Sequence, residues 1–122
     1  MTYIDGFVIA AAKADKDKVM DHARRMDRHF LDLGALRVVE AWGDDVPRGK
    51  LTDFYRAVQA GEEENVVFSW IEWPDKATRD AAFKVLEQDQ QLMSEPMPFD
   101  GKRMIFGGFT AEVVLTRGAS SA

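Results

Sequence analysis

One uninterrupted apolar run, Val66–Trp73, constrains the fold of this chain more than any other feature. It reads Val-Val-Phe-Ser-Trp-Ile-Glu-Trp and is followed at once by Pro74. Its β-branched and aromatic residues favour a strand, and the run is too short for a typical helix. Side chains alternate between the two faces of a strand, and bulky apolar groups fall on both faces here. Both faces of this central strand therefore need a covering layer.

Composition excludes several classes of protein. The 122 residues suffice for one domain, and the net charge of −5 argues against nucleic acid as a partner, because phosphate binding needs clustered Lys and Arg. No apolar run approaches the roughly 20 residues that cross a bilayer, and the N-terminus lacks the pattern of a secretory signal. The absence of cysteine excludes disulfides and thiolate metal sites. We expect a cytoplasmic protein with neither a membrane nor a nucleic-acid partner.

Hydrophobic periodicity predicts four strands and two helices. Asp15 or a neighbour caps the first helix, Gly34 ends it, and Asp75 caps the second. Gly107-Gly108 is interpreted as a bulge in the last strand. The predicted strands are 3–11, 35–42, 66–73 and 104–115, the helices are 15–33 and 75–89, residues 54–58 are an edge strand or a helical turn, and residues 90–98 are irregular.

The order strand–helix–strand–strand–helix–strand predicts a ferredoxin-like α+β sandwich (βαββαβ). Residues 1–115 form this single domain, and the small, polar residues 116–122 form a frayed tail. Both helices would cover one face of an antiparallel sheet. The other face would be an apolar patch larger than monomers normally expose. We therefore expect a homodimer in which a second subunit covers this open face.

Five blocks of the sequence are distinctive, namely Tyr3–Phe7, Gly34–Glu40, Trp42–Pro47, Val67–Pro74 and Met97–Met104. They resemble the bacterial family called domain of unknown function 1428, the YbaA-like group. The resemblance spans about residues 1–112 and implies a dimeric α+β barrel, closed between the sheets of two subunits. It implies no reaction, although wider relatives of such barrels include cofactor-independent monooxygenases, haem-degrading enzymes and ligand-binding modules.

Aromatic and charged side chains form a candidate ligand pocket inside such a barrel. Apolar walls with a few polar groups are typical of small-molecule sites, although the same aromatic residues could instead pack a solid dimer core. Glu72 lies in phase with Trp70, so it either pairs with Arg103 or Arg37 or sits at the barrel mouth with a raised pKa. The candidate residues are Tyr3, Trp42, Phe68, Trp70, Glu72, Arg103 and Phe106.

Other polar residues are weaker candidates. His22 and His29 flank the apolar stripe of the first helix, where half-exposed structural residues are expected more often than a proton acceptor or haem ligand. Asp44 and Asp45 match no metal-binding loop and are as well explained by turn chemistry. Lys102 and Arg103 could hold an anion, but a solvated turn paired with Glu72 or Asp45 is favoured. We expect no metal and no cofactor.

Two functions of different classes remain open. The first is a homodimeric module that binds a small apolar or aromatic molecule, without chemistry or with cofactor-free oxidation. The second is a structural or interaction protein with a packed barrel.

Overall fold

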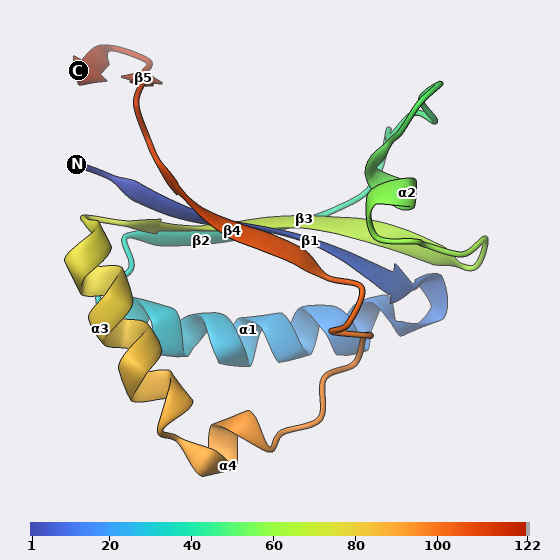
Figure 1. The fold of residues 1–122 in the computed structure, drawn as a ribbon, viewed down its shortest axis with the longest axis horizontal. Coiled ribbons are helices and arrows are strands. Elements are labelled where there is room, and N and C mark those ends of the chain that lie inside the picture. The colour runs from blue at the N-terminus through green and yellow to red at the C-terminus, as the bar shows by residue number, and fades with distance from the viewer. Residues whose placement is uncertain (122) are drawn as a thin grey trace.

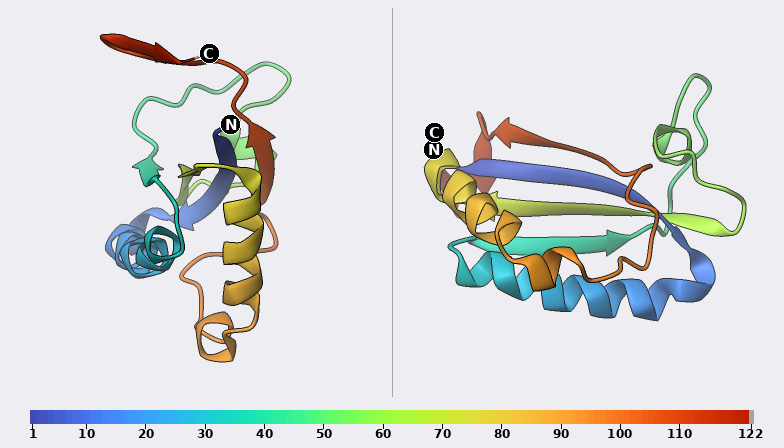
Figure 2. Two further views of the ribbon diagram at one scale, coloured as in Figure 1. Left: turned by 90° about the vertical axis from the view of Figure 1, so that its left-hand side faces the viewer. Right: turned by 60° about the horizontal axis from the view of Figure 1, so that its bottom comes forward.

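A four-stranded antiparallel sheet forms the body of the molecule. The computed structural model describes residues 1–121, and the strands lie in the order β2-β3-β1-β4 (Figure 2). Helices α1 and α3 pack on one face of the sheet (Figure 1). This arrangement confirms the predicted ferredoxin-like sandwich. The main elements are β1 (Tyr3–Ala12), α1 (Lys16–Asp32), β2 (Arg37–Trp42), β3 (Glu64–Trp73), α3 (Lys76–Glu87) and β4 (Ile105–Thr110).

Strand register decides which side chains face the helices. Ile71 and Trp73 of β3 are buried on the helix side, where they lie opposite Asp5 and Tyr3 of β1. The alternate residues of β3 point to the other side. We call this side the open face and define it by Phe68, Trp70 and Glu72 of β3 with Ile105 and Phe109 of β4.

The helix ends follow local capping chemistry. Gly34 adopts a φ of +113°, which confirms its predicted place after α1. The Asp75 side chain accepts the Thr78 backbone N–H at 2.7 Å, as predicted for the start of α3. Asp15 directly precedes α1 but makes no capping hydrogen bond, because the chain already enters through a short 3₁₀ turn, η1 (Lys13–Asp15).

Two short helices occupy segments that periodicity left undecided or irregular. Residues 54–58 contain α2 (Phe54–Ala57), capped by Asp53, which accepts the Arg56 N–H at 2.7 Å. The irregular segment predicted over 90–98 begins instead with α4 (Gln90–Met93), because Asp89 accepts the Leu92 N–H and starts a single turn. Helix α2 lies on the side of the open face and covers one end of it (Figure 1).

The predicted bulge at Gly107-Gly108 is wrong. The pairing of β1 with β4 is continuous, with Gly6 opposite Gly107 and Asp5 opposite Gly108. A Cβ atom on Gly108 would overlap the ring and hydroxyl of Tyr3. Glycine is therefore needed here for a close side-chain approach rather than for an extra residue in the strand.

Residues 116–121, which belong to the tail predicted as frayed over 116–122, take part in a hairpin. Strands β5 (Val114–Thr116) and β6 (Ala119–Ser121) pair as a hairpin whose turn is Arg117-Gly118. Gly118 supplies the positive φ of 78° that such a turn requires. The hairpin stands away from the sheet at the end opposite α2 (Figures 1 and 2), and Ala122 lies outside the described residues.

A buried ion pair joins β1, β3 and α3. The Asp5 carboxylate, whose side chain is only 3% exposed, accepts a hydrogen bond from Trp73 Nε1 at 2.9 Å. It also accepts bonds from Arg79 Nη2 at 2.9 Å and Nε at 3.1 Å. Trp73 is fully buried, with its ring edge against Phe30 of α1 and Phe83 of α3. This pair therefore fixes the start of α3 against the sheet.

Replacement of Arg79 by methionine tests this anchor. Arg79→Met should lower the free energy of unfolding by about 3 kcal/mol or more, since it leaves a buried carboxylate without its counter-charge. Urea denaturation gives the value. The control Lys76→Met removes the exposed pair between Lys76 and Asp80 and should cost less than about 1 kcal/mol. Equal losses in the two variants would contradict the role given to Arg79.

Candidate binding pocket and open face

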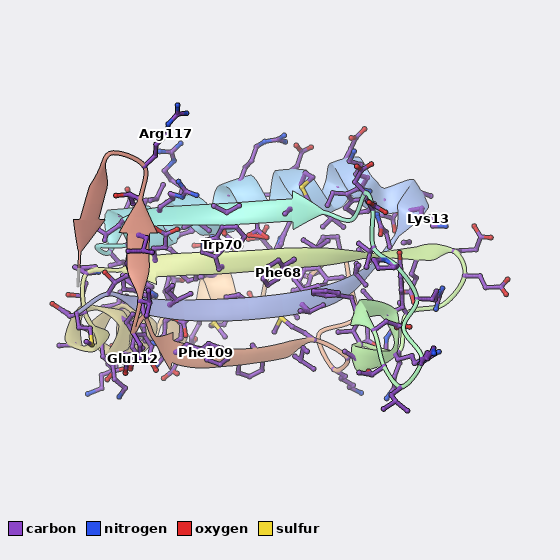
Figure 3. The ribbon with its side chains drawn as sticks, turned by 90° about the horizontal axis from the view of Figure 1, so that it is seen from above. Lys13, Phe68, Trp70, Phe109, Glu112 and Arg117 are labelled. Carbon is purple, nitrogen blue, oxygen red and sulfur yellow. The ribbon has the colours of Figure 1, made fainter. Side chains whose placement is uncertain are left out.

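The seven residues predicted to line one barrel pocket lie in three separate places. Phe68, Trp70 and Glu72 share the open face; in Figure 3, Phe68 and Trp70 lie on β3 and Phe109 lies on β4, with β1 between these strands. Tyr3, Trp42 and Phe106 lie on the helix side, and Arg103 precedes β4. The structure of one subunit therefore brings only three of the seven together.

Glu72 lies on the open face, in the row of Phe68 and Trp70. Its Oε2 accepts a hydrogen bond from Trp70 Nε1 at 2.8 Å and lies 3.3 Å from Nε of Arg37. Of the two partners proposed from sequence, Arg37 is correct, because it sits directly opposite Glu72 in the β2–β3 ladder. The carboxylate is thus paired and orients the Trp70 ring.

Register explains why the other aromatic residues face the helices. Trp42 lies opposite Val67, so it shares the helix side and packs near Val19 and Ile9. Tyr3 lies opposite Trp73. Phe106 lies opposite Phe7, with ring centroids 6.4 Å apart.

Arg103 pairs with residues other than those predicted. Its two terminal nitrogens lie 2.7 and 2.8 Å from the Glu64 carboxylate, and its Nε donates to Asp100 at 3.0 Å. The hydrogen bonds from Arg103 lower the pKa of Glu64 to about 2. Glu64 opens β3 whereas Glu72 lies near its far end, so the predicted pairing with Glu72 is wrong.

A cavity of about 200 Å³ lies on the helix side, between α1, the sheet and the segment that joins α4 to β4. In Figure 1, α3 starts at the sheet and then runs away from it, and no residue of α3 lines the cavity. The walls are mainly aromatic rings and methionines. The apolar side chains include Phe7, Met26, Phe30, Met97, Phe99 and Met104.

Two carboxyl groups interrupt this apolar lining. Asp27 of α1 and Glu40 of β2 both line the cavity and share a side-chain hydrogen bond. Two carboxyl groups make such a bond only when one of them holds a proton. Burial, together with the bond and the charge of Glu40, raises the pKa of Asp27 to about 8. The pair therefore carries one proton and one negative charge at neutral pH.

His22 also lines the cavity, whose other polar residues are Asp27, Glu40 and Ser69. The residue is only 8% exposed, so the half-exposed position expected from the helix pattern is wrong. Burial lowers its pKa, an effect only partly offset by Glu95 and Glu40, so the imidazole is neutral at neutral pH. Its Nδ1 atom is buried without a hydrogen-bond partner and lies 3.9 Å from a Glu95 oxygen. The second histidine, His29, is exposed.

Sequence reasoning missed the Asp27–Glu40 pair. Neither Asp27 nor Glu40 is among the seven pocket residues predicted from sequence. The available signal for Glu40 was its phase, because Glu40 alternates with Val38 and Trp42, which face the helices. Asp27 borders the apolar stripe of α1, but no spacing rule joins a helix residue to a strand residue thirteen positions later.

Within residues 1–121, no group of three or more His, Asp or Glu side chains is placed to hold a metal ion. In the same range, no helix is long and apolar enough to span a membrane.

Comparison with known proteins establishes the family. The family described as "Protein of unknown function (DUF1428)" matches residues 2–101. The chain belongs to this family. It is 52% identical over 111 residues to the uncharacterized protein YbaA of Escherichia coli K12 and to YbaA of Shigella flexneri, covering 89% of this chain and 95% of each relative.

One solved structure is similar in outline. It is the crystal structure of a dimeric ferredoxin-like protein from an uncultured marine organism. It is 13% identical, with a TM-score of 0.48, over 89% of this chain and 92% of that one.

The raised pKa of Asp27 predicts a pH-dependent stability. The pKa rises from 3.8 to about 8 on folding, so between about pH 4 and 8 the folded chain binds more protons than the unfolded chain. This contribution is fully present below about pH 4 and is lost as the pH rises toward 8. Asp27→Asn removes this contribution. The free energy of unfolding of the variant, relative to that of wild type, should therefore increase between about pH 4 and 8.

Urea denaturation across the pH range measures this effect. Asp32→Asn is the matched control, because Asp32 is an exposed aspartate on the same helix. Its difference from wild type should not change with pH. A pH-independent difference for Asp27→Asn would refute the shared proton.

Proposed function

We propose that the protein is a homodimeric module that binds a small, largely apolar molecule in the cavity between α1 and the sheet. The cavity is the observation that carries this proposal. Its walls are aromatic, methionine and aliphatic side chains, and its few polar lining residues are His22, Asp27, Glu40 and Ser69. Concave apolar sites with a few placed polar groups are the usual form of small-molecule sites.

The open face supports the dimer. Phe68 is 46% exposed, Ile105 46% and Phe109 60%, although all three belong to strands of the main sheet. Phe68 also touches the rings of Phe54 and Trp70, with centroids 5.8 and 5.5 Å away, so the exposed aromatic surface is continuous. Monomers seldom expose such a patch, and a two-fold dimer of identical faces is the commonest way to cover one.

In this proposal the two sites have different roles. Phe68, Trp70 and Glu72 line the space between the two sheets of the dimer, whereas the ligand enters the cavity on the helix side of each subunit. The ion pair of Glu72 with Arg37 and its bond to Trp70 support a packing role for that group. Ligand binding therefore does not require a hollow barrel.

A charge on the open face tests the dimer. Size-exclusion chromatography with light scattering should give twice the chain mass of 13.8 kDa. Phe68→Asp should shift the protein to monomer, because a carboxylate would be buried between the sheets. Val85→Asp is the control: Val85 is 53% exposed but lies on α3, on the other side of the sheet. A wild-type monomer at micromolar concentration would refute the dimer.

Filling the cavity tests the binding site. Native mass spectrometry of protein purified from its own host should detect one small molecule per subunit. Ala23→Phe places a ring in the cavity and should abolish this mass, whereas Ala81→Phe on the exposed side of α3 should retain it. Wild-type protein without ligand, or a ligand kept by Ala23→Phe, would favour the alternative of a structural or interaction protein.

A further inference from the structure

We infer that the cavity selects an organic cation, namely a small amine with an apolar or aromatic body, and that Asp27 and Glu40 bind its ammonium group. The inference rests on the proposed function, because it names the class of ligand for the same cavity. It follows from a charge that the protein leaves without a counter-charge, inside a space otherwise suited to an apolar molecule.

The uncompensated charge distinguishes this pair from other carboxylates at the sheet. Asp5 is held by Arg79, Glu64 by Arg103 and Glu72 by Arg37. In contrast, no lysine or arginine occurs among the side chains that line the cavity in the described part of the chain. A carboxylate that is partly removed from water is costly unless it is paired. The shared proton lessens this cost, but one negative charge remains.

His22 is a second, independent sign of a missing ligand. It lines the same cavity, is nine-tenths buried and has an Nδ1 atom without a partner. Polar atoms buried to this degree are nearly always hydrogen-bonded. A neutral imidazole nitrogen accepts an N–H group, and an ammonium offers up to three. The carboxyl pair thus supplies acceptors for an ammonium, and the His22 ring lies in the wall of the same cavity.

The cavity walls suit the remainder of such a ligand. Phe7, Phe30 and Phe99 present rings, and the methionines present flexible side chains that adapt to an apolar body. Aromatic rings also attract a cation that lies over their faces. An anion would instead meet the negative charge of the pair, and a neutral molecule would leave that charge unbalanced.

Ammonium binding should displace the shared proton. The titratable and charged groups around the site are Asp27 and His22 on α1, Glu40 on β2, and Arg25 and Glu95 beside the imidazole. Because a bound cation favours both carboxylates in their charged form, the affinity should increase from about pH 6 to about pH 8. The affinity can increase by at most about tenfold per pH unit, because binding releases one proton.

Isothermal titration calorimetry of the full chain with three probes of matched shape tests the inference. The probes are 2-phenylethylamine (a cation), 2-phenylethanol (neutral) and phenylacetate (an anion). The amine should bind at least about tenfold tighter than either, because hydrogen bonds to charged groups are the stronger ones. Asp27→Asn and Glu40→Gln should each weaken amine binding by a similar factor and leave binding of the alcohol unchanged. The control Asp32→Asn should bind all three as wild type does.

The outcomes separate this inference from the proposed function. If the alcohol or the anion binds as tightly as the amine, the inference is overturned and the pocket stands. If none of the three binds at millimolar concentration, both are overturned. If both folded variants, checked by thermal melting, keep the wild-type affinity for the amine, the assignment of Asp27 and Glu40 is overturned.

Discussion

The buried carboxylate of Asp5 is the interaction on which the arrangement of the helices depends. It accepts hydrogen bonds from Trp73 on β3 and from the guanidinium of Arg79 on α3, so a single group links two strands to a helix. Because both charges lie in a low-dielectric region and satisfy each other, the start of α3 cannot shift without leaving one of them unpaired. Trp73 adds ring contacts to both helices.

This anchor also determines where the interior is open. It holds α3 at one end of the sheet, and the helix then diverges from the strands (Figure 1). The far part of the helix side is covered by α1 and by the loop that carries Met97 and Phe99. Loop side chains fill space less completely than a packed helix, and the cavity lies beneath them. One end of the molecule is thus well packed and the other is hollow because α3 runs away from the sheet.

The sequence was sufficient for the fold and insufficient for the site, and the difference has a physical origin. Alternation and helical periodicity are local, so the elements and their order could be predicted, together with the open face of Phe68, Trp70 and Glu72. The relation of Trp42 to Trp70 depends on how β2 is aligned with β3, which no local pattern specifies. The same holds for Asp27 and Glu40, which meet only because α1 packs under β2. Arg103 is a third case. The topology brings the start of β3 close to the residue that precedes β4, so Arg103 pairs with Glu64, a partner that was not predicted.

The position of β1 has a consequence for how the chain acquires its structure. This first strand lies in the middle of the sheet, and both of its neighbours, β3 and β4, come from much later in the chain. During synthesis β1 therefore has no strand partner until β3 (Glu64–Trp73) has left the ribosome, and its second edge stays unpaired until β4 (Ile105–Thr110) follows. Pairings of such long sequence separation slow folding and prolong exposure of strand edges. This small domain is thus most open to aggregation while the chain is being released from the ribosome, and less so once it is folded.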